Sequence, residues 1–196
     1  MEETQIDKIQ KALGELKTKT PNVLKKAIND TAKQTRMKLG NKAKEKYAVK
    51  KSGFNKDMTI KNATVGRLEA TIKTKGEAME VGQFRASPFR VTNGKNRPKS
   101  IKAKVLTSSS MKELIKGDTK AFVTKFKSGH VAVVERVPSK QMKSNPKKEF
   151  LKKLLSPSTP QMIGSKKYVY GEIQPEIQSL LEKNIQKQIQ KVLEGR

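Results

Sequence analysis

The chain of 196 residues contains no cysteine and no tryptophan, and it has a single histidine. Without cysteine there is no disulfide framework, no thiolate zinc site and no cysteine nucleophile, so we expect synthesis in a reducing compartment. The histidine, His130, follows a turn glycine, and no second histidine or cysteine exists to complete a metal site with it. We therefore expect His130 to be a partly exposed hairpin residue, and we expect no metal and no cofactor.

Long apolar runs are missing as well. Residues 131–134 form one of the longest, far short of the roughly 20 residues that a membrane-spanning helix needs. The first residues are acidic, unlike the basic start of a secretion signal. Aromatic residues make up 5 % of the chain. We expect no membrane contact, and a core thin enough to need help from an oligomer or a partner.

Acidic residues are scarce: 18 Asp and Glu oppose 44 Lys and Arg, which leaves a formal charge of +26. Only 7 of the 44 are Arg. Because Lys lacks the planar fork of Arg, this balance favours sequence-independent attraction to polyanions, although a merely solubilising surface would look similar. Residues 91–150 hold the greatest excess, 15 basic against 4 acidic. We predict that these five residues face nucleic acid: Lys95, Arg97, Lys99, Lys102 and Lys104.

Catalytic patterns are also lacking. No glycine-rich phosphate-binding loop and no GxGxxG motif occur, and the acidic residues are scattered rather than clustered for metal binding. Ser/Lys pairs at SxxK spacing occur at Ser109 with Lys112 and at Ser144 with Lys147, about as often as chance predicts in so Lys-rich a chain. The sequence predicts a protein that is not an enzyme.

Apolar residues at helical spacing predict three helices. The first, over residues 1–20, carries the stripe Ile6, Ile9, Leu13 and Leu16. It should end before Pro21, because Thr20 and Pro21 are typical of a helix start, and a second helix should then run over residues 21–47. Gly40 should allow a kink or a close contact there. The last helix should start at Pro175 and end at Gly195, and its apolar stripe fits either core packing or a seam between subunits.

The middle of the chain shows the two-residue period of strands instead. Residues 68–72, Met79 with Val81, and residues 101–105 predict short strands, while residues 92–100 predict an exposed loop and residues 111–116 one or two helical turns. Residues 121–126 and 130–137, joined by a turn at Ser128 and Gly129, predict a hairpin. The expected fold is α+β, a small antiparallel sheet of about four strands packed with a long N-terminal helix and a C-terminal helix.

This pattern predicts three parts. Residues 1–20 form the amphipathic helix, residues 21–155 an α+β core domain, and residues 156–196 a connector followed by the carboxyl-terminal helix. Two prolines, Pro157 and Pro160, should keep the connector extended and rigid, because proline does not fit a helix interior.

Eight short segments follow one another in a characteristic order along the chain. The segments occupy residues 27–29, 47–50, 61–64, 68–72, 81–84, 117–123, 130–136 and 155–162. Their succession, above all Ala-Phe-Val at 121–123, the strand ending in Glu135 and Arg136, and the Pro-Ser-Thr-Pro-Gln-Met run at 157–162, resembles the phage minor tail protein Z family. The resemblance covers roughly residues 20–195.

The resemblance implies a non-enzymatic virion protein, assembled in the host cytoplasm, that completes the tail at its head-proximal end, permits head–tail joining and positions the DNA. We expect a homo-oligomeric ring that contacts other tail or neck proteins and, without sequence preference, genomic DNA. The alternative is a cytoplasmic nucleic-acid-binding protein, nucleoid-like or ribosome-associated. The predicted subunit contacts are Leu24, Ile28, Leu39, Pro157, Pro160, Met162, Leu181 and Ile185.

Overall fold

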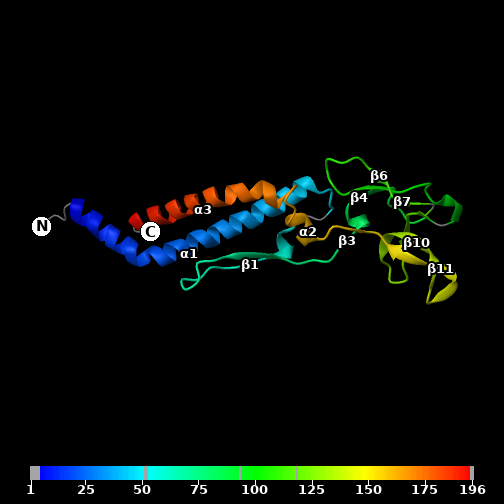
Figure 1. Ribbon diagram of the computed structural model, residues 1–196, viewed down its shortest axis with the longest axis horizontal. Coiled ribbons are helices and arrows are strands. Elements are labelled where there is room, and N and C mark those ends of the chain that lie inside the picture. The colour runs from blue at the N-terminus through cyan, green and yellow to red at the C-terminus, as the bar shows by residue number, and fades with distance from the viewer. Residues whose placement is uncertain (1–4, 51–52, 93, 118, 195–196) are drawn as a thin grey trace. The chain divides into compact units, whose positions relative to one another are not determined.

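The computed structural model describes residues 5–50, 53–92, 94–117 and 119–194 (Figure 1). The chain divides by its contacts into two units. The first contains residues 1–41, 55–75 and 163–196, and the second contains residues 42–54 and 76–162. Helices dominate the first unit and short antiparallel strands the second, so the predicted α+β class is confirmed.

Helix α1, Gln5–Lys46, begins in the first unit and continues into the second. The sequence predicted a break at Pro21, and that prediction is wrong, since Pro21 lies inside the helix. Proline removes one backbone hydrogen bond and crowds the preceding turn, which bends a helix without necessarily ending it. Figure 1 shows α1 changing direction within its dark-blue part. The side chains of Ile6, Ile9, Leu13 and Leu16 lie outside the described residues.

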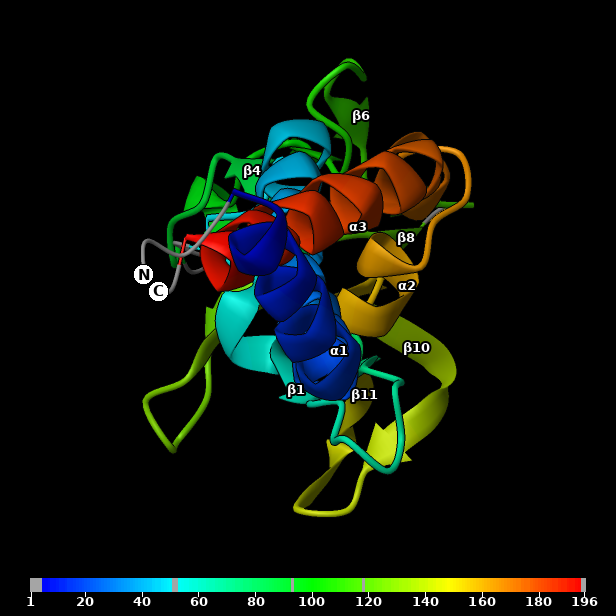
Figure 2. The same cartoon turned by 90° about the vertical axis from the view of Figure 1, so that its left-hand side faces the viewer.

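Helix α3, Tyr170–Leu193, runs antiparallel to α1 within the first unit (Figures 1 and 2). It begins five residues before the predicted start, and Pro175 lies inside it. Pro175 is the sixth residue of α3, just past the first four positions whose N–H groups lack helical partners, so it removes one backbone hydrogen bond without ending the helix. The predicted end at Gly195 lies outside the described residues.

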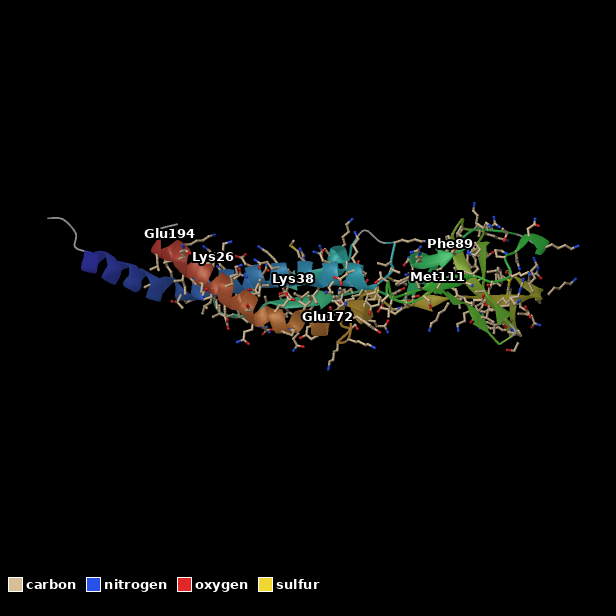
Figure 3. All side chains as sticks on the ribbon, turned by 90° about the horizontal axis from the view of Figure 1, so that it is seen from above. Lys26, Lys38, Phe89, Met111, Glu172 and Glu194 are labelled. Atoms are coloured by element: carbon tan, nitrogen blue, oxygen red, sulfur yellow. The ribbon has the colours of Figure 1, made fainter. Side chains whose placement is uncertain are left out.

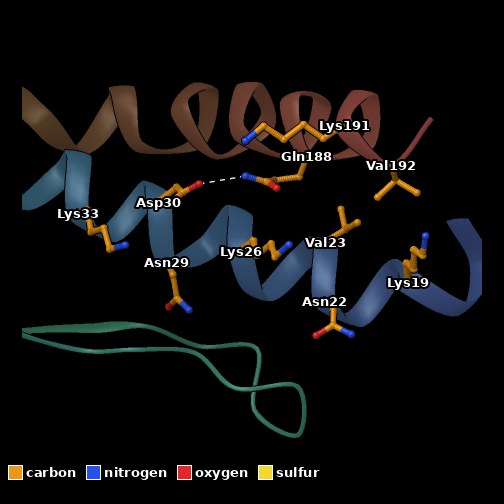
Figure 4. A pocket seen from close by; sticks show the side chains of 10 residues that line it. All are labelled: Lys19, Asn22, Val23, Lys26, Asn29, Asp30, Lys33, Gln188, Lys191 and Val192. Carbon is orange, nitrogen blue, oxygen red and sulfur yellow. Dashed lines mark hydrogen bonds between the residues drawn. The ribbon is translucent and has the colours of Figure 1, made fainter. Parts of the chain in front are cut away.

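Polar side chains join α1 to α3 at the centre of their contact. Asn184 and Gln188 are buried, and Gln188 Nε2 donates to Asp30 Oδ2 at 3.0 Å, as Figure 4 shows. Toward the start of α3, Lys38 Nζ pairs with Glu176 Oε2 at 2.5 Å. Figure 3 shows Lys26 and Lys38 along α1, and Glu172 and Glu194 near opposite ends of α3.

A two-stranded hairpin lies on the other side of α1 from α3 (Figures 1 and 2). Strand β1, Met58–Lys61, follows the 3-10 turn η1, Asn55–Asp57, and pairs antiparallel with β2, Thr71–Thr74. The amide of Asn29 on α1 both donates to the Ala63 carbonyl and accepts from its N–H. A Cβ at Gly40 would lie 2.6 Å from Asn55 Oδ1, so the close contact predicted at this glycine is confirmed. The predicted strand at 68–72 begins only at Thr71, and Leu68 is exposed.

The second unit holds the remaining strands in small antiparallel sheets. One three-stranded sheet has the order β4-β5-β6 and consists of Arg85–Ser87, Lys102–Lys104 and Lys112–Glu113. A second has the order β9-β10-β11 when read from its other edge and consists of Phe122–Lys125, Val131–Met142 and Asn145–Lys153. Strand pairs are formed by β3 with β12, Met79–Glu80 and Leu155–Ser156, and by β7 with β8, Ile115–Lys116 and Thr119–Lys120. Two 3-10 turns are η2, Val81–Gln83, and η3, Gly94–Asn96.

The core of this unit lies on both faces of the β9-β10-β11 sheet. Val123 and Val133 pack with Ile101 on one face, while Phe122 packs with Ala132 and Val134 on the other. The predicted hairpin is therefore confirmed, with Gly129 at φ 84° in its turn. Alternate residues of one strand thus serve two apolar clusters, which is why residues 132–134 are all buried.

Two local predictions are wrong. Residues 111–116 form β6 and β7 rather than helical turns, because Lys112 and Glu113 pair with β5 and Ile115 with β8. The connector is not extended throughout, since Pro160 lies in the short helix α2, Thr159–Ile163. Pro160 occupies the first turn of α2, where no backbone donor is lost.

Candidate functional site

One face of the β4-β5-β6 sheet is basic. Ala103 points into the core, so its neighbours Lys102 and Lys104 share the opposite face of β5. The register places Arg85 of β4 directly opposite Lys104, and Ser87 opposite Lys102. Two of the five predicted basic residues therefore lie side by side, joined by an arginine from a neighbouring strand.

This basic face carries an electrostatic cost. Like charges that lie directly opposite one another in a sheet destabilise it. Arg85 and Lys104 form such a pair. The cost is partly offset, because Lys104 Nζ donates to the Thr107 carbonyl at 2.7 Å and Lys102 Nζ lies 3.6 Å from Glu113 Oε1. An anion placed over this face would relieve the remaining repulsion.

Residues 94–99 supply the other three predicted cations. Gly94 has φ 57°, a conformation that favours glycine, and it opens the turn that carries Lys95. Lys95, Arg97 and Lys99 are exposed, as predicted for this loop. Arg97 nevertheless folds back, and its guanidinium carbon lies 4.2 Å from the centre of the Phe122 ring.

A cavity of about 450 Å³ opens beside this stacked pair, and we call it the Phe122 pocket. The second arginine at its wall is Arg136 of β10, whose guanidinium carbon lies 5.4 Å from the Phe122 ring centre. The charged and aromatic residues that line it are Arg97, Lys99, Lys120, Phe122, Arg136 and Glu149. Glu149 Oε2 lies 3.7 Å from Arg136 Nη1, so one carboxylate faces four cations.

A second basic surface lies in the first unit, along the α1–α3 pair (Figure 4). It is a groove of about 700 Å³. Lys19, Lys26 and Lys33 recur there every seven residues, about 10.5 Å apart along α1. Lys191 of α3 joins them, and the carboxylate in the groove, Asp30, is held by Gln188. Such a row of flexible ammonium groups suits an extended polyanion better than a compact ligand.

The predicted subunit contacts fall into two groups. Leu39 and Met162 are buried within the chain, so their side chains are already covered. Leu24, Ile28, Leu181 and Ile185 on the two long helices, and Pro157 and Pro160 at the connector, are partly exposed.

Sequence reasoning missed Arg85, Lys120 and Arg136 as members of the basic surfaces. The sequence identified Arg136 only as the end of a predicted strand. Its position at the Phe122 ring, near Arg97, depends on the β9-β10 register, in which Val134 pairs with Phe122. Alternation alone places Arg136 on the same face as Val134, so the hairpin prediction contained that signal.

His130 is exposed, as predicted, but it has a specific partner. Its Nε2 lies 2.8 Å from Glu80 Oε2, and Lys153 Nζ donates to Glu80 Oε1 at 2.8 Å. Burial raises the pKa of Glu80, but the hydrogen bonds from Lys153 and His130 outweigh it and leave that pKa below its ordinary value. The cluster joins β3 to β11 and to His130, the residue before β10, and its charges are those of a structural ion pair.

Neither a metal site nor a membrane span is found in the part of the chain that the structure describes. Among these residues, no three His, Cys, Asp or Glu side chains gather closely enough to hold a metal ion. No helix of the described ranges is long and apolar enough to cross a membrane.

Comparison with known proteins identifies a family. Residues 6–196 match the family of prophage minor tail protein Z (GPZ). No curated protein and no solved structure matches the chain. The family match covers both long helices and every described sheet. It also includes all eight short segments in which the sequence resembles this family. The chain therefore belongs to the prophage minor tail protein Z family, a family of structural phage tail proteins.

Proposed function

We propose that this chain is a tail-completion protein that acts at the head-proximal end of the phage tail. There it finishes a tail that can join a head, and it positions the DNA. The observation that carries the proposal is the family match over residues 6–196. The protein works as a non-enzymatic part of the virion, is assembled in the host cytoplasm and contacts other tail or neck proteins.

The working form in this proposal is a homo-oligomeric ring around an axial channel. A closed ring buries the same two surface patches of every subunit, so exposed apolar side chains become interface. Leu155 and Leu193 are 57 % and 52 % exposed, which supports such contacts. The partly exposed contact residues on α1 and α3, together with Pro157 and Pro160, are the proposed neighbours of these side chains in the assembly.

The basic face and the loop at residues 94–99 are the proposed contacts with DNA. The second unit has 24 Lys and Arg against 7 Asp and Glu, most of the excess of the chain. Lysine ammonium groups attract phosphates without fixing their orientation, so DNA is attracted but still able to slide. Lys95, Lys99, Lys102 and Lys104 supply this field.

Deletion of the gene from an inducible lysogen tests the tail role. We expect induced cultures to contain filled heads and separate tails in negative-stain micrographs, with few joined particles and a large loss of infectivity. Complementation by the wild-type chain should restore both. Normal, infective, DNA-filled virions in the deletion strain would contradict the proposal.

Two further measurements separate the ring from its alternative. Light scattering after size-exclusion chromatography should detect a ring, alone or with purified neck proteins. The alternative, a cytoplasmic nucleic-acid-binding protein, requires a monomer or small oligomer that is absent from purified virions. Mass spectrometry of purified particles distinguishes the two directly.

A further inference from the structure

We infer that the Phe122 pocket binds a single phosphoryl group with two ionised oxygens, either inorganic phosphate or a terminal phosphate monoester. The inference goes beyond the proposed tail role, because binding of a phosphoryl group is a property of the isolated chain. Only 7 of the 44 basic residues are Arg, and two of these, Arg97 and Arg136, meet at the Phe122 ring.

The Phe122 ring holds the two guanidinium groups in place. Phe122 is 8 % exposed, so its ring is fixed by the core and gives a rigid support. Stacking of a guanidinium on an aromatic face leaves the N–H donors at its edge available. Among the described residues, Arg97 has no carboxylate partner, so its donors are open to an added anion.

The charge of the pocket selects a dianion. Arg97, Lys99, Lys120 and Arg136 bring four positive charges, and Glu149 brings one negative charge. The remaining excess of three is better matched by a phosphate monoester, with a charge of about −1.5 to −2 at pH 7, than by a carboxylate or an internal phosphodiester. Arginine forks also bind phosphate oxygens in pairs, which a lysine does not do.

The size of the pocket limits what enters it. A volume of about 450 Å³ lies within the range of sites for small ligands. A phosphoryl group with the sugar that bears it fits such a space, whereas a duplex does not. The ligand is therefore free phosphate or the end of a strand, rather than a stretch of backbone.

Glu149 has a defined part in this site. Its Oε2 lies 3.7 Å from Arg136 Nη1, so it occupies the position of an anion when the ligand is absent. An incoming phosphoryl group must compete with this carboxylate for Arg136. Removal of the charge by Glu149→Gln should therefore strengthen binding, a gain that loss of folding does not produce.

Isothermal titration calorimetry of the full chain with inorganic phosphate, in a chloride buffer, tests the site. We expect Arg97→Lys and Arg136→Lys, which keep the charge but lose the fork, to weaken binding about tenfold or more. Glu149→Gln should bind several-fold more tightly. Arg90→Lys makes the same chemical change at an exposed arginine outside the pocket, and it should bind like the wild type.

Two single-stranded 12-mers that differ only in a 5′-phosphate or a 5′-hydroxyl distinguish the sources of the phosphoryl group. Tighter binding of the phosphorylated strand, lost in Arg136→Lys, would identify a strand end as the ligand. Equal binding of both strands with a response to inorganic phosphate would leave free phosphate as the ligand. Full affinity in both Arg→Lys variants, or no gain in Glu149→Gln, would overturn the inference while leaving the proposed tail role untouched.

Discussion

Asn184 of α3 donates from Nδ2 to Thr31 Oγ1 of α1 at 2.9 Å, and both side chains are buried. Thr31 in turn donates to the Ala27 carbonyl at 2.8 Å, so its hydroxyl both donates and accepts a hydrogen bond. A buried polar pair of this kind is satisfied at one alignment of the two helices, and a shift by one turn leaves both groups unpaired. The pair therefore specifies the alignment of α1 with α3.

Replacement of Asn184 by alanine should lower the free energy of unfolding by about 1 to 3 kcal/mol, because Thr31 loses its donor and a small cavity opens. Urea denaturation followed by circular dichroism measures the change. Gln186→Ala, two residues away on the exposed side of α3, should change stability by less than about 0.5 kcal/mol. Equal effects of the two variants would mean that the pair does not specify the alignment.

Replacement of Phe122 by alanine should cost about 3 to 5 kcal/mol, because the side chain is buried against Ala132 and Val134. Thermal unfolding provides the measurement. Phe89→Ala is the matched control, since Phe89 is 37 % exposed and should matter much less. An unchanged melting temperature for Phe122→Ala would show that the β9 register is reversed.

Acidification should destabilise the wild type more than Glu80→Gln. The pKa of Glu80 is lower in the folded chain than its ordinary value of 4.5, because the hydrogen bonds from Lys153 and His130 outweigh burial. A carboxyl group with a lowered pKa contributes stability above its unfolded pKa and loses it as the pH falls through the folded one. Urea unfolding at pH 7 and at pH 3 measures the difference.

The nearby Glu77→Gln variant is the control for this experiment, since Glu77 is exposed and lies three residues away on the same segment. It should follow the wild type. If Glu80→Gln and the wild type lose the same stability between pH 7 and pH 3, the pairing with Lys153 and His130 is not formed in solution.

Charge reversal in the loop, Lys95→Glu with Lys99→Glu, should leave the melting temperature unchanged, because both side chains are exposed. Binding to a 30-base-pair duplex should weaken. The slope of log affinity against log salt should fall by about 2, since each phosphate that a lysine no longer neutralises removes about 0.9 from it. Fluorescence anisotropy at several salt concentrations gives the slope.

The control for the loop variant is Lys183→Glu with Lys187→Glu on α3, which alters net charge by the same amount at exposed positions of the first unit. An equal decrease of slope in the control would assign DNA binding to net charge rather than to the loop. Unfolding of the loop variant would instead contradict its exposure.

Replacement of Pro21 by alanine should stabilise the chain by about 1 to 3 kcal/mol, since proline is unfavourable inside a helix and alanine is the best helix former. Helical ellipticity should rise or stay constant. Pro98→Ala, outside any helix, is the control. Lower stability of Pro21→Ala would mean that the bend in α1 is needed for packing.

The sequence predicted those elements whose apolar period is long and regular. Extended stretches of helical period predicted α1 and α3, and alternation around Gly129 predicted β9 with β10. The prediction failed at Pro21, where the helical residues on both sides override a local helix breaker. It also failed at residues 111–116, where pairing of Lys112 with β5 decides the conformation.

The distal part of the β10–β11 hairpin shows why other features were missed. Beyond Val137 the register of β10 against β11 shifts twice, first between Val137 and Gln141 and again before Met142. At such irregular positions a strand does not need alternating apolar residues, so the sequence there carries no strand pattern. The candidate site had a similar limit. The basic loop is visible as a run of lysines, but the meeting of Arg97 with Phe122 and Arg136 is a product of the tertiary fold.

The register that places Arg85 opposite Lys104 affects how the stability of the folded chain depends on the ions around it. A sheet whose like charges are only partly compensated gains stability from a dense supply of counter-ions, and it loses stability at low ionic strength. Added salt should therefore strengthen this sheet, contrary to its effect on proteins held by surface ion pairs. Closely packed phosphates are a dense source of such counter-ions. The same residues should therefore give the folded state its greatest stability next to phosphates.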